Sequence, residues 1–136
     1  MDKEFWLNKW NENQIGFHQS EYNNYLTNYV KNEFNGEYSK PTALVPLCGK
    51  TKDMIYLANY CEKVIGSELS EKACMDFFVE NALQFEVKEL SNNIKVFSSL
   101  NIELYCGDVF EVFEMDKSIF NQCNFIYDRA SLVALP

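Results

Sequence analysis

Two patterns of apolar residues alternate along this chain, one typical of helices and one typical of strands. Apolar residues that return every three or four positions predict helices over Lys3–Trp10, Glu21–Asn32, Lys52–Tyr60 and Glu71–Asn81. Short, mainly apolar runs predict strands over Thr42–Leu47, Lys63–Leu69, Ile102–Cys106 and Asn124–Asp128. Strand, helix and strand therefore alternate, an order typical of an α/β fold with a parallel sheet and right-handed crossovers.

A different pattern interrupts this order before the third of these strands. Phe85–Val87 and Ile94–Val96 alternate between apolar and polar residues, and the turn residues Ser91–Asn93 lie between them. This pattern predicts a β-hairpin inserted on the surface. We find no internal repeat and no low-complexity linker, so we expect a single domain over residues 1–136.

Composition narrows the class of protein. Twenty acidic and twelve basic residues give a net charge of −8, and no run of lysine and arginine is present, which argues against a nucleic-acid partner. The start of the chain does not resemble a signal peptide, and no apolar stretch is long enough for a membrane span. We therefore expect a cytoplasmic, monomeric protein with a small molecule as its partner.

Cysteine and histidine usage argues against metal chemistry. The five cysteines are widely spaced and form no C-x-x-C pair, which predicts reduced and mostly buried thiols. His18 is the only histidine, which excludes a site built from several histidines.

An apolar run, a turn with a single glycine and a later carboxylate form the most informative motif. The run Thr42–Cys48 leads into Gly49-Lys50-Thr51, and Glu68 follows Gly49 by 19 residues. This separation is close to the roughly 20 residues at which a carboxylate holds the ribose hydroxyls of a nucleoside cofactor.

Several interpretations of this turn compete. A phosphate-binding P-loop needs another glycine five positions before Gly49, where this chain has Leu44. A dinucleotide fingerprint needs three glycines, and only Gly49 is present. A nucleoside cofactor without phosphates, such as S-adenosylmethionine, needs only one. A plain strand-to-helix turn without a ligand stays open as the alternative.

The ends of the predicted strands carry further polar side chains. Glu68 is either a solvated carboxylate or a ribose ligand, and Asp108 is either the N-cap of the turn Val109–Phe113 or a neighbour of an adenine edge. Arg129 ends the fourth strand, and a cation at the ligand-binding edge of a parallel sheet needs an anionic partner. Because the carboxyl ends of parallel strands face the ligand crevice, we expect these side chains to gather there.

Five segments form a co-linear set: Phe5–Trp10, Gln14–Gln19, Val45–Lys50, Gly66–Ser70 and Tyr127–Pro136. In this order they resemble the thiopurine S-methyltransferase family, and the predicted hairpin stands where that family has an insertion. The match runs over essentially the whole chain. The related halide and thiol methyltransferases share the cofactor motif but usually lack the second and fifth segments.

The resemblance implies a Rossmann-like class I methyltransferase fold that binds S-adenosylmethionine, with a parallel sheet flanked by helices. It implies that a helical segment over residues 1–40 covers the cofactor. Within this segment Trp10 would pack on the cofactor, and Phe17 would also face the substrate.

The remaining family positions would lie at the strand ends. Leu47 would contribute from the glycine turn, and Glu68 would hold the ribose hydroxyls. Asp108 and Val109 would border the adenine, although many members have another residue type at the position of Asp108. Arg129 would contact the cofactor and the substrate side of the pocket.

The resemblance also implies the reaction. Family members methylate the sulfur of thiopurines, and bacterial members are also associated with selenium and tellurium compounds. We therefore expect an enzyme that transfers a methyl group from S-adenosylmethionine to the sulfur of a thiopurine or a related aromatic or heterocyclic thiol. Positioning supplies most of the rate in such an in-line displacement, so no strong base and no metal are expected. Arg129 is the candidate for steadying the anionic sulfur.

The family fold continues beyond the length of this chain. Its members add a helix, a fifth strand and a terminal antiparallel pair after the fourth core strand, so the resemblance implies a sheet truncated after that strand. Two hypotheses follow. The chain is either a fragment of a methyltransferase, or a catalytically inactive remnant that only binds the cofactor.

Overall fold

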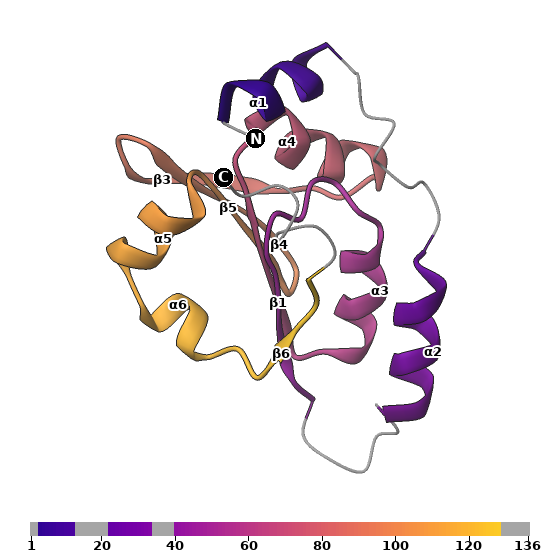
Figure 1. Cartoon of the computed structure of the whole chain (residues 1–136). Helices are drawn as coiled ribbons and strands as arrows, with labels where there is room; N and C mark the ends of the chain where they lie inside the picture. The colour runs from indigo at the N-terminus through magenta and orange to yellow at the C-terminus, as the bar shows by residue number, and fades with distance from the viewer. Residues whose placement is uncertain (1–2, 13–21, 34–39, 129–136) are drawn as a thin grey trace.

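The computed structural model describes residues 3–12, 22–33 and 40–128 (Figure 1). The elements within these ranges are α1 (Lys3–Asn11), α2 (Asn24–Glu33), β1 (Thr42–Val45), α3 (Asp53–Tyr60), β2 (Lys63–Glu68), α4 (Glu71–Glu80), β3 (Glu86–Ser91), β4 (Ile94–Ser99), β5 (Ile102–Cys106), α5 (Val109–Met115), α6 (Ser118–Asn121) and β6 (Phe125–Ile126). All the helices and strands expected within the described ranges are present, which confirms the α/β class.

The described strands form one sheet in the order β3-β4-β5-β2-β1-β6. The pairs β5–β2, β2–β1 and β1–β6 are parallel, as a Rossmann-like fold requires. The hairpin of β3 and β4 is antiparallel, and β4 also pairs with β5. The predicted hairpin is therefore confirmed, but it lengthens the sheet instead of lying on its surface.

The physical reason is the burial pattern of β4. Its residues Ile94 and Phe97 are buried, whereas β3 is exposed along its whole length. The apolar residues of β4 thus join the core of the sheet, and β3 is left as the solvated edge strand.

The core lies on both faces of the sheet. The larger cluster packs α2, α3 and α4 on one face, through side chains such as Val30, Leu57 and Phe77. The smaller cluster packs Val112 of α5 and Ile119 of α6 on the other face. Figure 1 shows α2 and α3 on one side of the sheet and α5 and α6 on the other.

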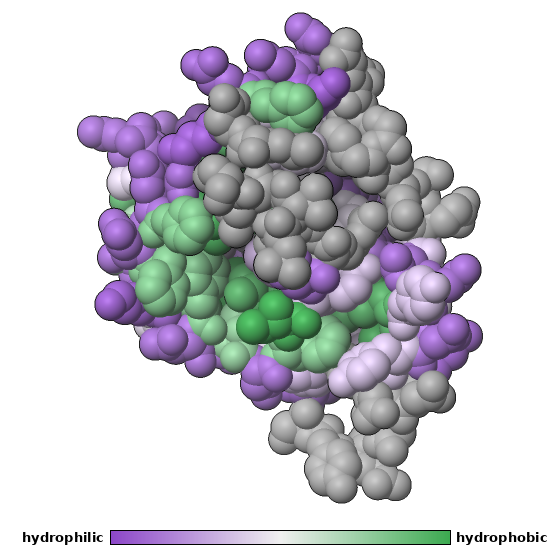
Figure 2. Space-filling model, in the orientation of Figure 1, coloured by the Kyte–Doolittle hydropathy of each residue, from purple (hydrophilic) through white to green (hydrophobic). Residues whose placement is uncertain are grey.

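Large apolar side chains are also exposed around the second face. Phe110 is 58% exposed, Phe113 41% and Ile126 63%. Figure 2 shows the resulting apolar surface, in green, across the region of α5, α6 and β6. All five cysteines are free thiols and four of them are buried, as the sequence predicted.

The structure corrects several element bounds. Strand β1 ends at Val45 and does not reach Leu47, because Leu47 turns the chain with a φ of +50°. Strand β6 covers only Phe125–Ile126, although Tyr127 N–H still donates to the carbonyl of Leu44 at 2.9 Å. Helix α2 begins at Asn24, since the side chain of Asn23 caps it.

Helix α6 was not predicted. It contains four residues, fewer than the two turns over which a helical period becomes visible. Among the described residues, no helix has the length and the apolar character that crossing a bilayer requires.

Candidate functional site

The carboxyl ends of β1, β2 and β5 meet at one edge of the sheet. In the parallel register Val45 lies beside Gly66, and Glu68 lies beside Cys106. The N–H of Gly107 donates to the carbonyl oxygen of Glu68 at 2.9 Å and joins the ends of β2 and β5. The loops that leave this edge carry most of the candidate residues.

Glu68 connects two of these loops through its side chain. Its Oε1 accepts a hydrogen bond from the N–H of Gly49 at 2.9 Å, and its Oε2 accepts one from the N–H of Ser70 at 2.6 Å. The side chain is buried, with 6% of its residue surface exposed. Burial raises the pKa of Glu68, while the backbone N–H groups work in the opposite direction. A carboxylate has about four lone-pair sites, and these backbone N–H groups occupy at least two of them.

The glycine turn is covered by α1. Gly49 has a φ of +57°, and a Cβ added to it would lie 3.0 Å from Cζ2 and 3.3 Å from Cη2 of Trp10. The indole of Trp10 therefore lies directly on the turn and is itself buried. Leu47 in the same turn is half-buried, and its N–H donates to Oγ of Ser67 at 3.2 Å. The structure thus brings Trp10, Leu47 and Glu68 together at the glycine turn.

Asp108 lies at the end of β5 and caps α5. Its carboxylate accepts a hydrogen bond from the N–H of Phe110 at 2.8 Å and pairs with Nζ of Lys3 at 2.9 Å. Burial works to raise the pKa of Asp108, but the hydrogen bonds from Lys3 and Phe110 outweigh it and hold that pKa below its usual value. The predicted N-cap is confirmed, and Val109 begins the helix that follows.

A cleft of about 580 Å³ lies beside these residues. Leu69, which follows Glu68, forms part of its wall together with Asp108, and Lys3 and Leu7 of α1 also line it. The other lining residues are Glu71, Asn92, Asn93, Lys95, Cys106, Gly107 and Glu111.

Sequence reasoning missed the contribution of the hairpin turn to this cleft. Asn92 and Asn93 indicate a turn and nothing more, and their place follows only from the pairing of β4 with β5. A Cβ at Gly107 would lie 3.1 Å from the carbonyl oxygen of Asn93, so the hairpin turn packs closely on the loop after β5. Lys3 was also missed, because nothing near it in sequence points to Asp108.

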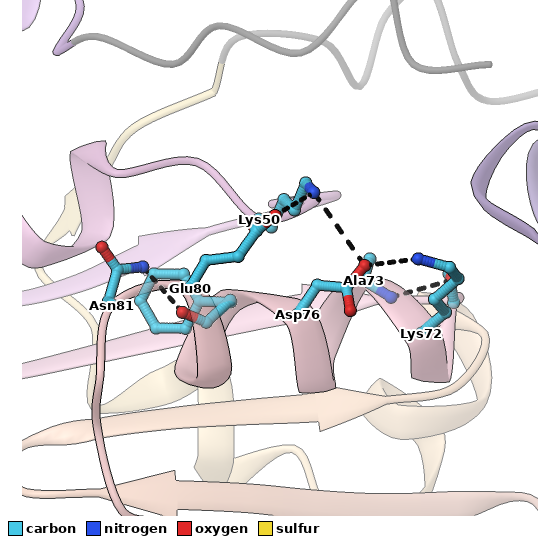
Figure 3. A network of polar contacts seen from close by, with 8 residues as sticks. Lys50, Lys72, Ala73, Asp76, Glu80 and Asn81 are labelled. Atoms are coloured by element: carbon cyan, nitrogen blue, oxygen red, sulfur yellow. Dashed lines mark hydrogen bonds and ion pairs between the residues drawn. The ribbon is translucent and has the colours of Figure 1, made fainter. Parts of the chain in front are cut away.

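Lys50 has a structural role. It is 6% exposed, and its Nζ lies 2.8 Å from Glu80 and 3.9 Å from Asp76. Figure 3 shows Lys50 reaching these two carboxylates of α4, where Asp76 also meets Lys72. A P-loop lysine points at a bound phosphate, so this arrangement agrees with the rejection of a P-loop.

Two of the predicted site residues, Phe17 and Arg129, lie outside the described residues. The covering segment 1–40 is described only in part, through α1 and α2.

Comparison with known proteins places the chain in a family. The family model described as "Thiopurine S-methyltransferase (TPMT)" matches residues 1–136. The thiopurine S-methyltransferase of Pseudomonas fluorescens (strain Pf0-1) is 44% identical over 136 residues, which are 100% of this chain and 60% of that protein. That of Pseudomonas putida is 40% identical over 100% of this chain and 60% of its own length. The probable thiopurine S-methyltransferase of Yarrowia lipolytica is 39% identical over 100% of this chain and 62% of its own length.

The chain thus spans about 60% of the length of the curated relatives it matches. The family model covers the chain from its first residue to its last, and the relatives align with all of it. The chain therefore belongs to the thiopurine S-methyltransferase family.

Proposed function

We propose that this chain uses S-adenosylmethionine to methylate the sulfur of thiopurines or of related aromatic or heterocyclic thiols. Selenium and tellurium compounds are further candidate acceptors. The observation that carries the proposal is the buried carboxylate of Glu68. It lies at the carboxyl end of β2 and bonds to the N–H of Gly49, and its neighbours Leu69 and Cys106 line a cleft of about 580 Å³.

The residues at this edge fit the proposed cofactor. The volume of the cleft lies within the roughly 300–1,000 Å³ that small-molecule sites occupy. The two lysines that line it are both paired with carboxylates, Lys3 with Asp108 at 2.9 Å and Lys95 with Glu71 at 3.0 Å. This pairing disfavours a ligand with phosphates and favours a nucleoside cofactor without them.

When bound, S-adenosylmethionine supplies an electrophilic methyl group on a positively charged sulfur. Glu68 would accept hydrogen bonds from the ribose hydroxyls, and Asp108 and Val109 would border the adenine. Trp10, which covers the glycine turn, would exclude water from the methionine end. Holding donor and acceptor in line contributes up to roughly 7–11 kcal/mol to such a reaction. Arg129 would pair with the anionic sulfur of the acceptor.

The proposal is tested by methyl transfer. The purified chain is incubated with methyl-labelled S-adenosylmethionine and mercaptopurine, and the S-methyl product is quantified. Hypoxanthine, which has oxygen in place of the sulfur, is the matched acceptor control. Glu68→Gln is the matched protein control, because its amide has the same shape but places an NH₂ against a backbone N–H.

We expect labelled product from mercaptopurine, little from hypoxanthine and little with Glu68→Gln. Equal transfer to both acceptors would contradict the sulfur specificity. Cofactor binding without any transfer would favour the alternative, a chain that binds the cofactor only. The cytoplasmic location, the monomeric state and the absence of nucleic-acid and membrane partners stay predictions.

A further inference from the structure

Asp53 is a buried carboxylate to which the proposed reaction gives no role. It is the first residue of α3 and has an exposed fraction of 0%. A carboxylate in such a place destabilises the fold unless hydrogen bonds satisfy its oxygens. The groups that form hydrogen bonds to Asp53 therefore indicate why a carboxylate is buried at this position.

The partners of Asp53 come from three separate parts of the chain. Its Oδ1 accepts a hydrogen bond from the N–H of Asn23 at 2.8 Å, and its Oδ2 accepts one from the hydroxyl of Tyr127 at 2.8 Å. Its own N–H donates to Oγ1 of Thr51 at 3.2 Å. One residue thus joins the start of α2, the end of β6 and the turn after β1.

Each partner adjoins a segment with predicted site residues. Thr51 closes the turn that contains Gly49, and Asn23 follows the segment that contains Phe17. Tyr127 stands two residues before Arg129.

Two of these partners are themselves held firmly. The side chain of Asn23 accepts hydrogen bonds from the N–H groups of Tyr25 and Leu26, at 2.9 and 3.2 Å. The N–H of Tyr127 donates to the carbonyl of Leu44 at 2.9 Å. Asp53 therefore connects elements that local hydrogen bonds already hold.

We propose that Asp53 is a positioning residue of the methyl-transfer site, which holds the glycine turn, the start of α2 and the end of β6 in one arrangement. The inference rests on the proposed function. It adds a residue that touches neither cofactor nor acceptor and acts through Asn23, Thr51 and Tyr127.

Three variants separate the parts of this role. Asp53→Asn can keep the hydrogen bonds with Asn23 and Tyr127, because its amide oxygen can accept from Asn23 while its NH₂ donates to the hydroxyl of Tyr127. Tyr127→Phe removes the hydrogen bond to Asp53, and Asp53→Ala removes those from both Asn23 and Tyr127. Leu57→Ala is the control, because Leu57 is fully buried on the same helix and has no part in these contacts.

The experiment measures the dissociation constant of S-adenosylhomocysteine by titration calorimetry. Each variant is studied at a temperature at which circular dichroism shows it to be fully folded. We expect Tyr127→Phe to weaken binding about tenfold, which corresponds to a binding-competent population of about one tenth. Asp53→Ala is expected to weaken binding at least as much, and Asp53→Asn to stay within about twofold of the unchanged chain. Leu57→Ala is expected to lower the melting temperature and leave the dissociation constant unchanged.

The outcomes distinguish the two proposals. An unchanged chain that does not bind S-adenosylhomocysteine overturns the proposed function, and this inference with it. An unchanged chain that binds, with Tyr127→Phe and Asp53→Ala binding equally well, overturns the inference alone. Equal weakening by Leu57→Ala also overturns it, because the effect then follows from lost stability and not from position.

Discussion

Replacing Gly49 with alanine tests the packing of α1 on the glycine turn. The added Cβ would lie 3.0 Å from Cζ2 of Trp10, and the φ of +57° is one that side chains other than glycine rarely adopt. The backbone strain costs about 1–3 kcal/mol. The contact with Trp10 must also lengthen by a few tenths of an ångström, which moves the indole or α1.

We expect Gly49→Ala to lower the free energy of unfolding by about 1–3 kcal/mol, measured by urea denaturation. Tryptophan fluorescence in a Trp6→Phe background reports on Trp10 alone, and we expect its emission to shift to longer wavelength as the indole gains solvent. Ala82 provides the matched control, because it has a φ of +54° and is exposed. Ala82→Gly is expected to raise stability by up to about 1 kcal/mol through the relief of strain alone.

The reasoning would be refuted by a Gly49→Ala chain that keeps both its stability and its Trp10 emission. A stability loss without a change in emission would support the backbone conformation but contradict the contact with Trp10.

Three further predictions concern the surroundings of the site. Lys50→Met removes a buried cation from Glu80, which is half-exposed and can be hydrated, so we expect a loss of about 1–2 kcal/mol in urea denaturation. Gly66→Ala places a Cβ 2.6 Å from Cδ2 of Leu104, so we expect a loss of about 1–3 kcal/mol from overpacking, part of which Leu104→Val should restore. Asp108 has a lowered pKa, so its charge stabilises the folded chain above the ordinary aspartate pKa, and this contribution is lost as pH falls through the lowered value. Asp108→Asn is therefore expected to be less stable by under about 1 kcal/mol at neutral pH and equally stable in acid, measured by urea denaturation at both pH values.

Each of these predictions has a result that contradicts it. A Lys50→Met chain as stable as the unchanged one would show that the ion pair contributes nothing. Additive effects of Gly66→Ala and Leu104→Val would show that the two side chains do not compete for space. A stability difference for Asp108→Asn that persists in acid would assign the effect to shape and not to charge.

The sequence predicted the parts of the fold that depend on local periodicity. Strand β2 and helix α4 lie where the apolar spacing placed them, and Ser70 caps α4 as expected by accepting from the N–H of Ala73 at 3.1 Å. The place of the hairpin could not be predicted, because alternation shows that a strand forms and not which strand it pairs with. A helix as short as α6 leaves no period to detect.

Some residues of the candidate site could likewise be predicted from the sequence, and others could not. Glu68 was predictable because its separation from Gly49 follows from one strand–helix–strand unit of ordinary length. Trp10 was named as a site residue only because of the resemblance to the family, since the sequence of its own helix does not indicate a contact with Gly49. The contacts of Lys3 with Asp108 and of Asp53 with Tyr127 join residues far apart in sequence, and only the folded chain reveals them.

The central claim, that Glu68 holds a nucleoside cofactor at the end of β2, is tested most directly by calorimetric titration with S-adenosylhomocysteine. The unchanged chain is compared with Glu68→Ala and with Glu62→Ala, an exposed glutamate just before the same strand, as the matched control. The account predicts saturable binding by the unchanged chain and by Glu62→Ala, and its loss with Glu68→Ala. Binding that survives Glu68→Ala, or an absence of binding by a chain that circular dichroism shows to be folded, would contradict it.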